Sequence, residues 1–418
     1  MKILLHDTKF IGDEIPWLKD LRTQGRQAYV KQGIPTAKTE AWKYTKPNRF
    51  LENSFSYTPS NLIGISKGKP FPFDCYQINF TNGVFNPFKS YLPQGIEVLP
   101  IIEAIMFAPK IREKISQLAD INKNPFVALN TSYLNEGVYI HISSNVDIKK
   151  PLAIVYETIC TDRDDMFNLR NLIEVEKNSS VQIIESFSYE GKVKSSYFMN
   201  LVNEIYLGEN ASLKHYKLQN EAFKAGHIAY NAVKVCADAS YKSFCLQKGA
   251  DLARNESYVL LSDEGANACV DAAYIMNGWA TIDTTTNIKH LKPHTISSQL
   301  VKGVVGGQAK GVFQGKIHIV PNAVKTEGYQ LHKAMLLTDD AEIDVKPELE
   351  IFADDVKCSH GSACGELDKE QLFYMQSRGI SEDKAKQLLI EAYLNDVIAK
   401  VDDEKIIEWI KLSLDNNS

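Results

Sequence analysis

One short segment, FADDVKCSHGSACG at residues 352–365, collects side chains that bind metals. Its two thiols, Cys358 and Cys364, lie on either side of His360. Thiolate and imidazole together suit zinc, iron and iron–sulfur species. If residues 356–360 form a strand, Cys358 and His360 project from the same face, with Cα atoms about 6.5 to 7 Å apart. Both side chains could then reach one metal ion.

The rest of the segment leaves the ligand set open. Gly361 permits a sharp turn after which Cys364 could return as a further ligand, but we interpret Cys364 as structural. Asp354 and Asp355 could orient the ligands, or could be turn residues that bond their own backbone. One C-x-H-x3-C spacing is a much weaker signal than paired CxxC motifs. A complete metal site, a partial site finished by another chain and a purely structural pair all remain possible.

Other reactive residues form weaker groups. His290 and His294 are four positions apart, but Pro293 between them argues against one helical face. The glycines at 303–315 match neither GxGxxG nor GxxxxGK[ST], so we predict that this chain binds no nucleotide. Ser359 lies beside His360 without a GxSxG elbow, and nothing indicates a nucleophilic triad.

The bulk composition is that of an ordinary globular protein. The chain has 418 residues, 44% hydrophobic and 24% charged, which suits two or three domains. A net charge of −5 gives no attraction to nucleic acid or to anionic membranes. No apolar run approaches the roughly 18 residues of a membrane span, and no signal-peptide core is present. Seven cysteines, an odd and low number, favour a reducing compartment. We therefore expect a soluble, cytoplasmic protein.

The chain divides into three parts by its local pattern. Residues 1–136 are mixed and partly helical. Within them, 13–33 predicts a helix, 101–121 predicts a helix broken near Pro109, and Asn82-Gly83 predicts a hairpin. Residues 137–366 carry β-type alternation, and residues 367–418 return to helical spacing.

The central part has a repeat that is typical of a stacked fold. Small polar clusters separate alternating strands at intervals of 27 to 32 residues. These clusters are Asn178-Ser179-Ser180, Asn210-Ala211-Ser212, Asp238-Ala239-Ser240 and Gly265-Ala266-Asn267. No long helical pattern lies between the strands, which disfavours a doubly wound fold. We predict a mainly β protein whose core is a β-helix, or β-solenoid, with an antiparallel sandwich as the alternative.

The C-terminal part predicts helices at 367–379, 381–401 and 402–414. Ser381 is a good N-cap residue. The apolar positions of the second helix fall on one stripe, formed by Ala385, Leu388, Leu389, Ala392, Tyr393 and Val397. An uncapped solenoid exposes sheet edge, so we expect these helices to cover its open end.

Several segments resemble one known family. The sequence IDVKPELEIFADDVKCSHGSACGELDKEQLFYMQSRGI, residues 343–380, closely resembles the C-terminal signature of the SufB/SufD family of iron–sulfur cluster assembly scaffolds. AKGVFQGKIHIVPNAVKTEGYQLHKAMLL at 309–337 and IPTAKTEAWKYT at 34–45 are also similar to that family. The KCSHG run and the chain length resemble the D-type subunit, SufD.

The resemblance implies a fold, partners and a site. It implies a right-handed β-helix flanked by helical segments, a heterodimer with a SufB-type subunit and a SufC-type ABC ATPase docked on the C-terminal helices. It also implies a non-catalytic scaffold in which His360, with Cys358 beside it, helps to hold a transient iron–sulfur cluster at the subunit interface. Where the family usually has Ala-Thr after this motif, the chain has Ser362, Ala363 and Cys364. The extra thiol leaves a local variation in ligation open.

Two other functions compete with this one. A β-helix could be a carbohydrate-active enzyme, but the acidic pairs Asp339-Asp340 and Asp354-Asp355 are adjacent residues, which point to opposite faces of a strand. The chain could also be a stand-alone homodimeric metal-binding scaffold, because a homodimer remains possible when the protein is alone. Neither nucleic acid nor membrane is an expected partner.

Overall fold

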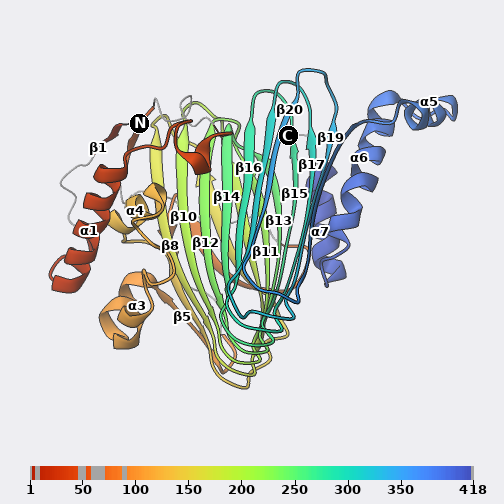
Figure 1. Cartoon of the computed structure of the whole chain (residues 1–418). Coiled ribbons are helices and arrows are strands. Elements are labelled where there is room, and N and C mark those ends of the chain that lie inside the picture. The colour runs from red at the N-terminus through yellow and green to blue at the C-terminus, as the bar shows by residue number, and fades with distance from the viewer. Residues whose placement is uncertain (1, 5–9, 46–52, 58–70, 87–91, 416–418) are drawn as a thin grey trace.

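The chain folds as a β-solenoid built from two facing sheets (Figure 1). The computed structural model describes residues 2–4, 10–45, 53–57, 71–86 and 92–415. The first sheet, sheet A, has the order β1 (Lys2–Leu4), β2 (Ser54–Ser56), β8 (Asp165–Val175), β10 (Tyr197–Leu207), β12 (Ala225–Val235), β14 (Leu252–Leu261), β16 (Thr281–His290), β18 (Lys310–Ile319) and β20 (Glu342–Ile351). In addition, β6 (Val138–Ile142) pairs with β8, and β5 (Ile96–Pro100) pairs with β6.

The second sheet, sheet B, holds the alternate strands. Its order is β21 (Lys357–Glu366), β19 (Glu327–Leu336), β17 (Ile296–Val305), β15 (Asn267–Met276), β13 (Ser240–Gly249), β11 (Ser212–Glu221), β9 (Ser180–Glu190), β7 (Leu152–Ile159), β3 (Tyr76–Thr81) and β4 (Val84–Phe85). From β6 onward, successive strands alternate between the sheets, and from β8 onward each pairs in parallel with the strand one turn earlier. The prediction of a mainly β solenoid is confirmed.

The polar turns of the sequence explain this geometry. Asn178, Asn210 and Asp238 occupy the same turn position and have φ of 57°, 54° and 53°. Asn and Asp tolerate this left-handed conformation better than other non-glycine residues. The side-chain amide of Asn210 donates to the side-chain oxygen of Asn178 at 3.1 Å. The side-chain amide of Asn178 donates in the same way to Asn145 at 3.0 Å. The ladder of turn amides keeps neighbouring turns in register.

The N-terminal helices lie against the outer face of sheet A (Figure 1). They are α1 (Pro16–Gln32), α3 (Ile101–Phe107) and α4 (Pro125–Ser132), with 3-10 turns η1 (Glu40–Trp42) and η2 (Pro109–Glu113). The predicted break near Pro109 is confirmed, and so is the hairpin, because Asn82 and Gly83 join β3 to β4 with positive φ. Gly25 allows α1 to approach α4, since a Cβ there would lie 2.9 Å from the Ala128 carbonyl oxygen.

The C-terminal helices α5 (Lys369–Ser377), α6 (Glu382–Ile398) and α7 (Glu404–Asp415) do not cover the open end. α6 contacts β15 and β17, and buried residues of α6 and α7, among them Leu394 and Ile406, pack in one cluster with residues on the outer face of sheet B. The expectation of an end cap was therefore wrong. An apolar stripe shows that a helix face is buried, but it does not say which surface buries it. Leu388, assigned to that stripe, is 36% exposed.

The last strand of each sheet has a free edge. β20 ends sheet A and β21 ends sheet B, and neither strand has a second neighbour among the described residues. Unpaired strand edges are sites for pairing with another chain unless they are blocked or covered. No helix of the described residues is long and apolar enough to span a membrane.

Candidate metal-binding site at the open end of the solenoid

The segment that opened the sequence analysis forms the edge strand β21. It pairs with β19 in parallel register, so that Cys358 lies opposite Gly328 and His360 opposite Gln330. The amide of Lys357, just before Cys358, donates to the Thr326 carbonyl oxygen at 2.9 Å. Alternate residues of a parallel strand point their N–H and C=O groups to alternate sides. The even-numbered residues of β21 therefore direct their backbone groups to the free edge. They are Cys358, His360, Ser362, Cys364 and Glu366.

The same even-numbered residues direct their side chains into the solenoid. The register places Ser362 beside His332 and Cys364 beside Ala334, and both neighbours are buried residues of the interior row of β19. The prediction that Cys358 and His360 share a strand face is confirmed. Because the solenoid ends here, His360 is nevertheless exposed. The imidazole thus lies at the mouth of the interior, within reach of a neighbouring chain.

The two thiols differ in their surroundings. Cys358 is half-buried and packs against the cluster that contains Ile317 and Ile319, whereas Cys364 is exposed. Burial raises the pKa of the Cys358 thiol despite a backbone hydrogen bond at Gly328, and burial also raises the pKa of the Cys364 thiol. Both thiols are therefore protonated at neutral pH, and a metal that binds either of them must displace a proton.

The distances between these residues along the strand limit which of them can bind one metal ion together. Cys364 is four residues from His360, so their Cα atoms lie about 13 Å apart along the strand. Cys358 and His360 are only two residues apart. Among the described residues, no three His, Cys, Asp or Glu side chains come together closely enough to hold a metal ion. Within this chain, Cys358 and His360 are a pair of donors rather than a full coordination sphere.

The two acids that precede the motif lie in the turn between β20 and β21. Asp355 has φ of 51°, and its carbonyl oxygen accepts a hydrogen bond from the Lys325 amide at 2.7 Å. Asp354 and Asp355 are both exposed. The two acids therefore lie in the turn that leads into β21.

His332 is a neighbour of the motif that the sequence did not reveal. It is fully buried on β19, in the position paired with Ser362 of β21. Its Nε2 lies 2.8 Å from the hydroxyl of Tyr274. Its ring stacks on Phe313 at 5.2 Å between centroids. The only signal in the sequence is the strand register, which places position 332 beside position 362 and depends on knowing the length of each turn.

The burial of His332 predicts acid sensitivity. Burial lowers the pKa of His332 to about 4, whereas an unfolded histidine titrates near 6.5. The unfolded chain therefore takes up the proton first, so the contribution of neutral His332 is complete above about pH 6.5 and is lost as pH falls toward 4. We expect the free energy of unfolding of the wild type to drop by about 2 kcal/mol more than that of His332→Gln between pH 7 and pH 5. Urea titrations at both pH values measure it, and parallel pH profiles would contradict it.

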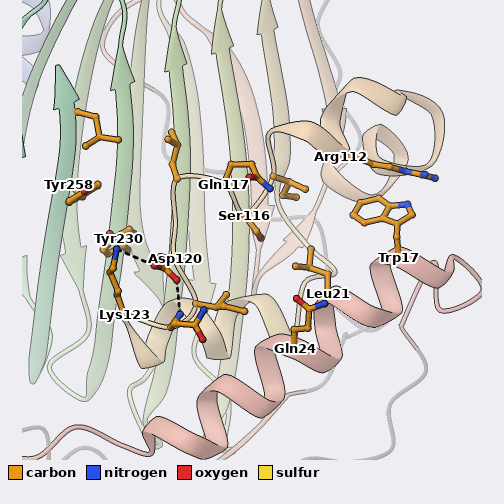
Figure 2. A pocket seen from close by; sticks show the side chains of 15 residues that line it. Trp17, Leu21, Gln24, Arg112, Ser116, Gln117, Asp120, Lys123, Tyr230 and Tyr258 are labelled. Carbon is orange, nitrogen blue, oxygen red and sulfur yellow. Dashed lines mark hydrogen bonds and ion pairs between the residues drawn. The ribbon is translucent and has the colours of Figure 1, made fainter. Parts of the chain in front are cut away.

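A cavity lies elsewhere, against the outer face of sheet A (Figure 2). It measures about 510 Å³ and is lined by residues of α1, of the segment 112–123 and of the strands β12 and β14. Trp17 and Arg112 line one side, and Tyr230 and Tyr258 line the other. Its lining contains neither cysteine nor histidine. The cavity therefore lacks the thiol and imidazole donors that the end of β21 supplies.

Comparison with known proteins gives the same family at both ends of the chain. Residues 158–393 match the SUF system FeS cluster assembly, SufBD core domain, and residues 6–154 match the SufBD protein N-terminal region. The core match alone spans more than half of the chain and includes the whole of β21.

Individual relatives agree with these matches. An iron–sulfur cluster assembly SufBD family protein of Synechocystis is 29% identical over 88% of this chain and 84% of its own length. The iron–sulfur cluster assembly protein SufD of Escherichia coli is 27% identical over 93% and 90%, and SufD of Bacillus subtilis is 28% identical over 96% and 93%. The solenoid, its matched core and its SufD-like relatives together place this chain in the SufBD family of iron–sulfur cluster assembly proteins.

Proposed function

We propose that this chain is a SufD-like scaffold subunit that pairs through the open end of its solenoid with a SufB-type subunit in the cytoplasm. In this proposal His360, with Cys358 beside it, forms half of a shared site where a nascent iron–sulfur cluster is held transiently. The cluster is the cargo of the assembly. The chain itself performs no catalysis, and ATP hydrolysis belongs to a SufC-type partner.

The observation that carries the proposal is the position of His360 on the free edge of β21. A strand added to this edge would lie about 4.8 Å away, the usual spacing between paired strands. Its inward side chains would then stand next to the imidazole of His360 and the thiol of Cys358. A cysteine or acid of the partner at that position would complete a coordination sphere for iron.

The C-terminal helices offer a surface for the ATPase. Helix α5 has no buried residue, and its aromatic residues Phe373 and Tyr374 are 72% and 58% exposed. The helix extends away from the solenoid (Figure 1). Exposed aromatic residues on a protruding helix are typical of protein-binding sites. We assign the docking of the SufC-type ATPase to this helix.

Co-expression tests the assembly directly. The chain is produced with a SufB-type and a SufC-type subunit, and the purified material is analysed for stoichiometry, iron and acid-labile sulfide. We expect a three-component complex that contains both elements. A chain that purifies alone, without iron, would contradict the proposal.

A proline substitution on the free edge of β21 distinguishes binding of the partner strand from folding of this chain. Ser362 directs its N–H away from β19, so Ser362→Pro removes a donor to the partner but none within this chain. Gly361 before it accommodates the extended conformation that proline requires of the preceding residue. We expect affinity for the SufB-type subunit to fall at least about tenfold, with unchanged thermal stability of the isolated chain. Ser362→Ala keeps the N–H and should bind like wild type; equal loss in both variants would show that the edge backbone is not involved.

The carbohydrate-enzyme alternative predicts a different result. Both acidic pairs, Asp339-Asp340 and Asp354-Asp355, lie in exposed turns beside the strand ends. A glycan array or a hydrolysis screen that gave a specific signal with the isolated chain would favour this alternative.

A further inference from the structure

The outer face of sheet A carries a row of acids at its free end. Side chains of β20 alternate, and Ile343 and Val345 pack inside the solenoid. The alternate residues therefore face outward. They are Glu342, Asp344, Lys346, Glu348 and Glu350, four acids and one base. Any strand placed along this edge would set its own outward side chains beside them, at about 4.5 to 5.5 Å between Cβ atoms.

The neighbouring bases do not neutralise the row. Lys310 is shared by Glu342 at 2.7 Å and Asp344 at 2.5 Å. Lys346 is shared by Glu348 at 3.5 Å and by Glu40 of the N-terminal segment at 2.6 Å. The remaining acid of the row, Glu350, accepts from Lys316 and His318 at 2.5 and 2.8 Å. Five carboxylates thus share three lysines, and the face keeps a net charge near −2 when His318 is neutral.

The backbone of β20 adds a second asymmetry. The amides of Glu342 and Phe352 donate to sheet A at 3.0 Å each, so the odd-numbered residues direct their backbone groups to the free edge. Pro347 is one of those residues, near the middle of the strand, and it has no N–H. The edge therefore offers carbonyl oxygens throughout but lacks a donor at its centre.

These two features act against a second copy of the chain. Two copies joined end to end would be related by a two-fold axis, so the same patch would meet itself. In the two-fold arrangement that continues each sheet with its own counterpart, the acids of one β20 would lie along those of the other, and Pro347 would lie near its own counterpart. Like charges directly opposite one another destabilise a strand pair. The outward face of β21 carries no acid and therefore adds no such repulsion. Its residues are Lys357, Ser359, Gly361, Ala363 and Gly365.

We propose that the acidic outer face of β20 selects the partner: it disfavours a second copy and favours a strand that carries Lys or Arg at alternate, outward positions. This inference rests on the proposed pairing through the open end and adds the chemistry by which that end recognises its partner. Charge patterns of this kind govern partner choice more than total affinity.

The test neutralises three of the acids at once. Glu342→Gln, Asp344→Asn and Glu348→Gln are combined in one variant. A control variant removes the same charge far from the open end, at exposed turn residues, with Asp162→Asn, Glu209→Gln and Glu264→Gln. Affinity for the SufB-type subunit and self-association of the isolated chain are both measured by analytical ultracentrifugation, at 50 and 500 mM NaCl.

The two complexes should respond in opposite directions. At low salt we expect about tenfold weaker binding of the SufB-type subunit and about tenfold stronger self-association, with both effects reduced at high salt. The control variant should behave like wild type. General damage to the fold would weaken both complexes, so opposite shifts cannot come from that source.

Other outcomes separate the inference from the function on which it rests. Unchanged partner affinity, or unchanged self-association, in the triple variant would overturn the inference even if wild type binds the SufB-type subunit. If wild type does not bind that subunit at all, the proposed function fails. Stronger self-association of the triple variant would then still support the claim that the acids exclude a second copy. Unchanged self-association would reject that claim as well.

Discussion

Replacement of His360 by alanine is expected to leave the three-subunit assembly intact and to remove its iron and sulfide almost completely. The imidazole is exposed at the mouth of the solenoid, and its backbone faces the free edge on which the partner strand would lie. In the proposed site it supplies the nitrogen donor of the pair formed with Cys358. Loss of a direct ligand costs more than the 10- to 100-fold that disturbed supporting contacts cost, so we expect about a tenth of the wild-type iron content or less. Elemental analysis of the co-purified complex measures it.

Two matched variants make this result specific. His294 is a turn histidine with a 47% exposed side chain outside β21, so His294→Ala should retain wild-type iron. Cys364→Ser should also retain it, because Cys364 lies about 13 Å from His360 along the strand. Full iron content in the His360→Ala complex would remove His360 from the site. Loss of iron in Cys364→Ser would mean instead that the extra thiol takes part.

The sequence could predict the solenoid because its signal is local and repeated. Each turn carries a residue that tolerates positive φ, such as Asn178 or Asn210, between two alternating strands, and the spacing of these turns equals the length of one circuit. The shared face of Cys358 and His360 followed from strand geometry alone. These features depend on a few neighbouring residues, so they do not require knowledge of the tertiary structure.

Features that depend on distant contacts could not be predicted in this way. The stripe on α6 correctly placed Ala385 and Val397 in the interior, but it did not show that the helix covers sheet B rather than the open end. Likewise, β21 has a free edge because the described residues after it, up to Asp415, form helices rather than a further strand of sheet B. Periodicity describes every strand of a solenoid alike and does not mark the last one, where the candidate site lies.

A buried ion pair beneath the N-terminal helices is the clearest case of such a contact. Arg170 and Glu204 stand on adjacent strands of sheet A, β8 and β10, with 1% and 0% of their side chains exposed. Charged residues at outward positions of a strand are expected in solvent, so nothing in their sequence context indicates burial. The N-terminal segment covers this face of sheet A and thereby buries the ion pair.

The partners of the pair explain why it is retained. The guanidinium donates to the Glu204 carboxylate from Nη2 at 2.7 Å and from Nε at 3.1 Å. The carboxylate also accepts the backbone amides of Ser116 at 2.7 Å, Leu118 at 2.9 Å and Ala119 at 3.2 Å. One acid thus fixes the segment that walls the cavity of Figure 2. Ser116 has φ of 61°, a conformation held by these bonds.

Arg170→Met is therefore expected to destabilise the protein by about 3 to 5 kcal/mol, because it leaves the Glu204 carboxylate buried without its counter-charge. Urea unfolding at pH 7 measures the loss. As a control, Lys149→Met removes one partner of the exposed ion pair with Asp147 and should change stability by less than about 0.5 kcal/mol. The double variant Arg170→Met/Glu204→Gln removes the stranded charge and keeps an acceptor for the segment, so it should recover part of the loss. A single variant as stable as wild type would show that the carboxylate does not depend on Arg170.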